Sequence, residues 1–313
     1  MACMSINYQN SLEVVDTSNS FFINRTCSGG PGIFCSRLQK SLIEQGLKLT
    51  KDSINQISVI SGHYKDKVNN ILRLDGLYFK KNDKRNRNIF ESYKKFDHVV
   101  FQGEFCKQQY EAFTGIKKNH SIIPNGVGEN FFTKQNNILT KTRPRVIASA
   151  SWRRHKRLEE IIEAFKDVRL KNVDLWVLGG KNKKFQGLTS NIYLFNSLPV
   201  DALPTTYQSC DAMIHLAWLD WCPNTVVEGL ASGLPVLCSH NGGTKELVKD
   251  SGLIIELEED YIPGTELDLY SPPKVDTNKI VEAVLELIEI PKPKTREDLK
   301  IDNVALKYKE TFK

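Results

Sequence analysis

Short apolar runs alternate with amphipathic segments along most of this chain, and this alternation limits its fold more than any other feature. Strands that alternate with helices are typical of βαβ units built on a parallel sheet. In the first half we expect a tight loop at CSGGPG and a helix from about Ile33 to Gln45, which Gly46 ends. The expected strands are SFFINR, QISVISG, NILRLDGLYF, HVVFQG and HSIIPNGV.

The same pattern restarts after residues 133–144, TKQNNILTKTRP, which are polar and end in proline and therefore resemble a linker. The later strands are RVIASAS, VDLWVLGG, NIYLF, DAMIHLA, PVLCS and GLIIE, with helices from about His155, Pro223 and Thr244. A chain of 313 residues is long for one core. We predict an α/β fold of two Rossmann-like domains, residues 1–140 and 141–313, whose parallel sheets face each other across a cleft. The last helix, about 296–313, is a candidate to pack back on the first domain.

Composition is that of an ordinary globular protein, with a modest net charge of +6 that is unevenly spread. Residues 80–95, KKNDKRNRNIFESYKK, hold seven basic and two acidic residues. They fit a solvated loop that leads into a helix, or a docking surface for an anionic acceptor or a membrane. Seven scattered cysteines without a CxxC pair favour a reducing compartment. Without a signal-peptide pattern or a run of about 18 apolar residues, we expect a cytoplasmic protein, with peripheral membrane contact left open.

A glycine-rich stretch, TCSGGPGIF at residues 26–34, lies between an expected strand and an expected helix. Glycines there let the backbone approach a ligand, and a helix N-terminus offers N–H groups to an anion. Gly29, Gly30 and Gly32 do not have the GxGxxG spacing, and no P-loop lysine follows. A binding loop and a structural turn both remain open from this stretch alone.

Four cations, Arg153, Arg154, Lys156 and Arg157, lie in SASWRRHKRLEEI, where a strand ends and a helix is expected to begin. Ligands of open α/β sheets bind outside the carboxyl ends of the strands. Arginine suits phosphate oxygens, whereas cations at a helix N-terminus oppose the macrodipole. The cluster therefore favours an anion site over a solvated first turn.

The stretch DWCPNTVVEGLASGLPVLCS places Asp220 before a helix and Glu228 within it, so the two carboxylates do not share one helical stripe. They are expected to flank a ligand from two sides of the helix start. Asn224 is a candidate cap, and the N–H groups of Asn224, Thr225 and Val226 are expected to be free. A carboxylate accepts hydrogen bonds from both hydroxyls of a diol, so this site suits a polyol. Taken alone, Asp220 could instead be a carboxylate that the helix dipole favours, and Glu228 could be a surface residue.

Together, GGPG, IIPNGV, KRLEEIIEAF, the D-x7-EGLASGLPV stretch and NGGTKELV resemble the retaining glycosyltransferases of family 4, which have the GT-B fold. The resemblance spans about residues 21–255 and is most specific in the second half. It implies that the second domain holds a nucleotide diphosphate sugar, such as a UDP- or GDP-sugar, and that the first domain receives the acceptor.

The resemblance also implies roles for individual residues. Glu228 matches the acid that binds the donor ribose, Asp220 replaces the glutamate that faces the donor hexose, and Lys156 matches the phosphate-binding lysine. The N–H groups of Asn224, Thr225 and Val226 would assist at the sugar, and Gly29, Gly30 and Gly32 would pack against the diphosphate.

Three positions depart from the family pattern. Ser151 stands where the family has an arginine, and we expect Arg153 to take over that role. Asp220 reaches less far than the usual glutamate, which leaves the donor hexose undefined. Asp75, beside Arg73, is the nearest candidate for the family histidine of the first domain; a turn aspartate before Gly76 is the alternative.

No Asp-x-Asp motif occurs, and the six histidines lack ligand spacing, so we predict no metal and no cofactor beside the substrate. The leading interpretation is a retaining hexosyltransferase that acts on a glycan, lipid-linked or small-molecule acceptor and has no nucleic-acid partner. The alternative is a non-catalytic protein that binds a sugar nucleotide or glycan on the same fold. An oxidoreductase is disfavoured because GxGxxG is absent.

Overall fold

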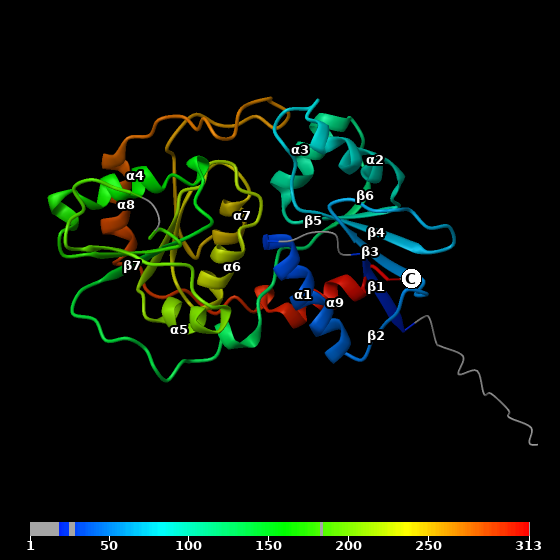
Figure 1. The fold of residues 1–313 in the computed structure, drawn as a ribbon, viewed down its shortest axis with the longest axis horizontal. Coiled ribbons are helices and arrows are strands. Elements are labelled where there is room, and N and C mark those ends of the chain that lie inside the picture. The colour runs from blue at the N-terminus through cyan, green and yellow to red at the C-terminus, as the bar shows by residue number, and fades with distance from the viewer. Residues whose placement is uncertain (1–18, 25–28, 182–183, 313) are drawn as a thin grey trace, which may run out of the picture.

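The computed structural model describes residues 19–24, 29–181 and 184–312, and these form two parallel six-stranded sheets, one in each half of the chain. The first sheet has the order β2-β1-β3-β4-β5-β6 and the second the order β12-β11-β10-β7-β8-β9. Figure 1 shows the two halves side by side, with helices packed around each sheet. The predicted α/β class with two Rossmann-like sheets is confirmed.

The first half contains strands whose buried apolar residues meet the helices on either face of the sheet. Its elements are β1 (Ser20–Asn24), α1 (Gly29–Glu44), β2 (Lys48–Leu49), β3 (Asn55–Val59), β4 (Asn69–Leu74), η1 (Lys84–Asn86), α2 (Arg87–Lys95), β5 (His98–Phe101), α3 (Glu104–Thr114), β6 (Asn119–Ile122) and η2 (Glu129–Phe131).

The second half repeats the arrangement after the irregular stretch that follows η2. Its elements are β7 (Arg145–Ser149), η3 (Arg154–Lys156), α4 (Leu158–Phe165), η4 (Val168–Leu170), β8 (Asp174–Leu178), β9 (Ile192–Leu194), η5 (Val200–Ala202), α5 (Leu203–Gln208), β10 (Ala212–His215), α6 (Asn224–Ala231), β11 (Val236–Ser239), α7 (Thr244–Val248), β12 (Gly252–Ile255), α8 (Thr277–Leu287), η6 (Glu297–Leu299) and α9 (Ile301–Lys309).

The last helix, α9, lies against α1 of the first half rather than against the sheet that precedes it in sequence. Val304 and Tyr308 are fully buried there, and the Tyr308 ring lies 6.2 Å from that of Phe34. The Ser41 hydroxyl donates to Asp302 over 2.6 Å. The chain therefore crosses between its halves twice, once after β6 and once before α9.

Two helix starts differ from the sequence-based expectation. The glycines expected in a loop before Ile33 lie in the first turn of α1, where Pro31 is tolerated because first-turn N–H groups have no partner within the helix. The helix expected from about His155 is divided: a 3₁₀ turn ends at Lys156, and α4 begins at Leu158. Arg157 separates them with a φ of 57°, a left-handed conformation that interrupts a continuous helix.

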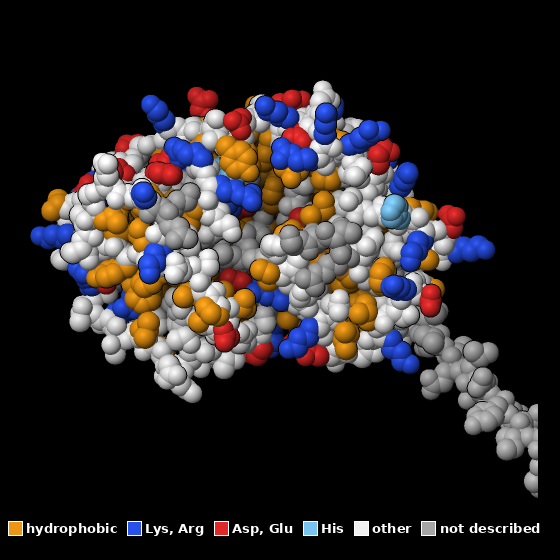
Figure 2. Space-filling model, viewed as in Figure 1, with side chains coloured by type: hydrophobic (Ala, Val, Ile, Leu, Met, Phe, Trp, Pro, Cys, Tyr) orange, Lys and Arg blue, Asp and Glu red, His pale blue; other side chains and the backbone are white. Residues whose placement is uncertain are grey.

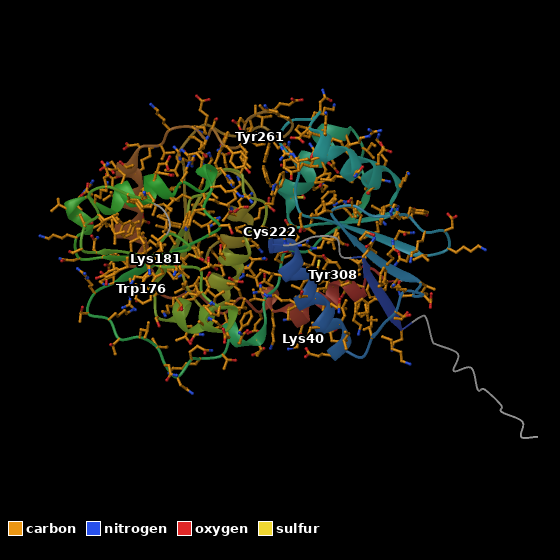
Figure 3. All side chains as sticks on the ribbon, viewed as in Figure 1. Lys40, Trp176, Lys181, Cys222, Tyr261 and Tyr308 are labelled. Carbon is orange, nitrogen blue, oxygen red and sulfur yellow. The ribbon has the colours of Figure 1, made fainter. Side chains whose placement is uncertain are left out.

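A cluster of aromatic and apolar side chains joins the two halves on one side. Phe79 and Phe105 of the first half pack against Trp221 and Tyr261 of the second, with the Phe79 and Trp221 rings stacked 5.1 Å apart. Figure 3 labels Tyr261 at the upper junction between the halves. Among the described residues, no helix is both long and apolar enough to cross a membrane.

Candidate functional site

A cavity of about 1030 Å³ lies between the two halves and is lined by residues that follow the carboxyl ends of strands in both sheets. The first half contributes the residues after β1, β4 and β5, and the second those after β7, β8 and β10. Figure 2 shows the molecular surface hollowed between the two halves. Ligands of open α/β folds bind at this edge of the sheet. The cavity contains most of the candidate residues.

Glu228 lies one turn into α6, and its carboxylate is buried at the wall of the cavity. The Arg37 Nη2 atom, from α1 of the other half, donates to Glu228 Oε1 over 2.7 Å, and the Tyr207 hydroxyl donates to Oε2 over 3.4 Å. Burial raises the pKa of Glu228, and both partners oppose that rise. The carboxylate therefore has hydrogen-bond partners from two elements besides its own helix.

Asp220 precedes α6 and forms an ion pair with Lys156 of η3. The His215 Nε2 atom, at the end of β10, lies 3.0 Å from Asp220 Oδ2. Burial opposes ionisation of Asp220, but Lys156 and His215 outweigh it and hold its pKa well below the ordinary value. Burial also lowers the pKa of His215, which favours the neutral ring. Asp220 is thus an ionised carboxylate that a cation and an imidazole hold in place.

Asp75 follows β4 on the opposite wall of the cavity, where it is paired with the fully buried Arg73. Gln102 donates to Asp75 Oδ1 over 3.1 Å, whereas Oδ2 is buried without a partner among the described residues. A side chain on Gly76 would overlap the Trp221 indole, and Gly76 has a φ of 126°. Asp75 lines the cavity, and Arg73 and Gln102 both contact its Oδ1 atom.

The start of α6 connects the two halves through Asn224. Its Nδ2 donates to the Gly30 carbonyl over 3.0 Å, and its Oδ1 accepts from Asn125 over 2.7 Å. The expectation that Asn224 caps α6 is wrong, because Pro223 is the N-cap and Asn224 is the first helical residue.

The expectation of a free Val226 N–H is also wrong, since this group donates to the Pro223 carbonyl over 3.0 Å. Thr225 lines the cavity with Asn224, and their N–H groups stand in the first helical turn. Gly29 and Gly30 line the cavity as well, whereas Gly32 is buried within α1 and is absent from the cavity wall.

The four basic residues around η3 serve different purposes. Arg153 is exposed at the cavity mouth, and Lys156 faces Asp220 inside. Arg154 binds Glu160 over 2.6 Å, and the fully buried Arg157 binds Glu258 over 2.8 Å. The anion site expected from this cluster does not include all four cations, because three of them are paired with carboxylates and, of those three, Lys156 lines the cavity.

Several residues at or just behind the cavity wall were not anticipated from the sequence: Arg37, Gln102, Asn125, Tyr207 and His215. His215 had a signal, since it lies in the expected strand DAMIHLA, five residues before Asp220. The others come from elements whose approach depends on how the halves pack. No cluster of three His, Cys, Asp or Glu side chains suited to a metal ion occurs in the described part of the chain.

Comparison with known proteins agrees with this geometry. Residues 130–301, more than half of the chain, match the family described as glycosyl transferases group 1. No curated protein matches the sequence. Sucrose-phosphate synthase (tll1590) from Thermosynechococcus elongatus superposes with a TM-score of 0.68 at 12% identity, over 93% of this chain and 97% of that one.

Two further solved structures share the fold. Anabaena Alr3699/HepE, solved in complex with UDP-glucose, gives a TM-score of 0.61 at 13% identity, over 93% of this chain and 94% of that one. WaaG, a glycosyltransferase involved in lipopolysaccharide biosynthesis, gives 0.51 at 14% identity, over 93% and 95%. With two parallel sheets facing one cavity, the fold is GT-B, and the chain belongs to the glycosyl transferases group 1.

Proposed function

We propose that this glycosyltransferase moves a hexose-type sugar from a nucleotide diphosphate sugar to an acceptor hydroxyl, with retention at the anomeric carbon, as in family 4. One observation carries the proposal: Glu228 and Lys156 line the same cavity. A carboxylate that accepts from a diol and a cation that attracts a diphosphate meet the two chemical requirements of such a donor. HepE, which shares the fold, has been solved with UDP-glucose.

In this proposal, Glu228 accepts hydrogen bonds from the ribose hydroxyls of the donor. Lys156 stabilises the charge that grows on the diphosphate as it leaves, and Arg153 reaches it from the cavity mouth. Gly29 and Gly30 let the backbone of the first half approach the same diphosphate. Asp220 receives a hydroxyl of the hexose.

Asp75, which lines the cavity on the opposite wall, receives a second hydroxyl. The acceptor oxygen attacks the anomeric carbon from the face that the diphosphate leaves, and the bond between that carbon and the phosphate oxygen breaks. The hydroxyl proton passes to the departing phosphate oxygen. These steps assign neither a metal nor a cofactor, and the sugar nucleotide is a substrate.

The experiment is a binding and turnover series with UDP-glucose, GDP-mannose and ADP-glucose. We expect one of them to raise the melting temperature. At a hundredfold excess over its Kd, a ligand that binds only the folded chain adds about 2.7 kcal/mol to the free energy of unfolding. We also expect slow release of the nucleoside diphosphate, since water replaces the acceptor. Binding without any turnover, with glycan, lipid-linked and small-molecule acceptors, would favour the non-catalytic alternative. Absence of both would refute the proposal.

The acceptor is proposed to enter over the basic segment 80–95. Lys80, Asp83 and Arg85 of this segment line the cavity, and the Arg85 guanidinium lies 3.6 Å from the centre of the Tyr78 ring. The seven cations of the segment are all exposed, and they favour an acceptor carried on an anionic membrane surface. Sedimentation with phosphatidylglycerol vesicles, compared with phosphatidylcholine vesicles, tests this. Equal sedimentation with both would contradict it.

A further inference from the structure

Arg37 is the residue through which the first half of the chain reaches the candidate ribose carboxylate. It lies in α1, 191 residues before Glu228, and its Nη2 atom is 2.7 Å from Glu228 Oε1. The Arg37 side chain is only 14% exposed, and its guanidinium lies 5.7 Å from the centre of the buried Phe131 ring. The ring and the carboxylate together fix the plane of the guanidinium.

The Glu228 carboxylate retains room for a ligand while it holds Arg37. Each carboxylate oxygen has two acceptor positions. Oε1 uses one for Arg37 and Oε2 uses one, at 3.4 Å, for Tyr207. Each oxygen therefore keeps one acceptor position for a hydroxyl of a vicinal diol.

The charges around Glu228 make Arg37 its main electrostatic partner. Burial raises the pKa of Glu228, Arg37 from α1 lowers it most, and Tyr207 from α5 lowers it less. Lys156 and Asp220, which line the same cavity, are paired with each other. Among the described residues, removal of Arg37 would leave the buried Glu228 carboxylate with the neutral Tyr207 hydroxyl as its side-chain partner, and the pKa of Glu228 would rise further.

We propose that Arg37 is a positioning residue for the donor, which orients the Glu228 carboxylate toward the ribose diol and makes ribose recognition depend on contact between the two halves. This inference rests on the proposed function. A second contact between the two halves lies nearby, where Asn224 Nδ2 donates to the Gly30 carbonyl over 3.0 Å. Separation of the halves would break both contacts, so the ribose site is complete only when the cleft is closed.

The test compares Arg37→Met and Arg37→Lys with Lys40→Ala, a control on the same helix whose side chain is 77% exposed. The probes are UDP-glucose and its 2′-deoxyribose analogue, with binding measured by calorimetry between pH 5.5 and 8. For Arg37→Met we expect a Kd for UDP-glucose at least tenfold weaker at pH 7, and a further loss of affinity as the pH falls. The affinity for the 2′-deoxyribose analogue should fall less on this substitution, because the analogue makes one fewer hydrogen bond to Glu228.

Two further measurements separate positioning from a structural role. At saturating donor, kcat of Arg37→Met should stay within about threefold of wild type, and Arg37→Lys should restore part of the affinity. An Arg37→Met variant with a wild-type Kd, or with a wild-type pH dependence of Kd, would overturn the inference. Equal losses for both probes would do the same. Failure of the wild-type chain to bind any of the three sugar nucleotides would instead refute the proposed function, and this inference with it.

Discussion

Glu246 spans the two halves of the chain and offers a direct measurement of how strongly they are joined. From α7 of the second half, its two carboxylate oxygens accept from the N–H groups of Glu104 and Phe105, each over 2.6 Å. These N–H groups open α3 of the first half, whose N-cap is Gly103 and has no capping side chain. A carboxylate from the other half therefore caps this helix.

The structure sets the size of the effect of Glu246→Ala. Hydrogen bonds to a charged group each contribute about 1.5–3 kcal/mol, and loss of an N-cap costs about 1 kcal/mol. Burial raises the pKa of Glu246, and the desolvation cost behind that shift offsets part of the two bonds, so we expect a net loss of about 2–4 kcal/mol. Gly103→Ala should cost a similar amount, because its new methyl group would overlap Glu246 Oε2. The φ of Gly103, −171°, is open to alanine, so backbone strain does not contribute.

The assay is urea denaturation of both single variants and of the double variant, with Asp250→Ala, an exposed change just after α7, as the control. In the double variant the methyl group added at position 103 no longer meets a carboxylate. The combined cost should therefore be smaller than the sum of the single costs, with a coupling of at least about 1 kcal/mol. Additive costs, or a Glu246→Ala variant within roughly 0.5 kcal/mol of the control, would refute the reasoning.

Three further outcomes are expected. Lys156→Met should lower kcat about 10²–10³-fold in a nucleoside diphosphate release assay, because the leaving charge loses its cation; a kcat within about threefold of wild type would contradict this. Burial and the nearby Lys156 lower the pKa of His155 from 6.5 to about 4, so the unfolded chain binds more protons than the folded one between these values. The free energy of unfolding should fall by up to about 3 kcal/mol as the pH drops from 6.5 to 4. In urea denaturation at several pH values, His155→Gln should reduce this pH dependence, whereas the exposed His63→Gln should not. Glu258→Gln leaves the buried Arg157 without its counter-ion and should cost about 3–5 kcal/mol in the same measurement; an unchanged midpoint would contradict it.

The positions of Glu228 and Asp220 were predictable because local rules decide them. A strand followed by a turn and a helix start places both acids at the carboxyl edge of a parallel sheet. Because Asp220 precedes α6 and Glu228 lies within it, the two acids do not share one helical stripe, and the structure has them beside the same cavity. Sheet class and the approximate helices followed from the same periodicity.

What the sequence could not supply is the choice of partner. Arg37 meets Glu228 only because α1 lies against the second half, and no local pattern encodes that approach. The same limit explains the basic cluster: Arg157 finds its counter-ion in Glu258, far along the chain, and so leaves the anion site. Four cations in a short stretch predict a strong positive field, but how much of that charge stays unpaired depends on carboxylates that include Asp220 and Glu258 from other segments.

The cavity pairs each proposed ligand-binding acid with a cation: Glu228 with Arg37, Asp220 with Lys156, and Asp75 with Arg73. These pairs differ in what a donor must do to them. Arg37 and Arg73 can stay in place while hydroxyls bind the acids, but a diphosphate has to draw Lys156 away from Asp220. On the proposed function, that exchange frees an acceptor position on Asp220 Oδ2, which His215 still contacts, for a hydroxyl of the sugar. The diphosphate end of the donor would then prepare the site for its hexose end, so a free sugar without its diphosphate should bind weakly, because it meets an acid that Lys156 already occupies.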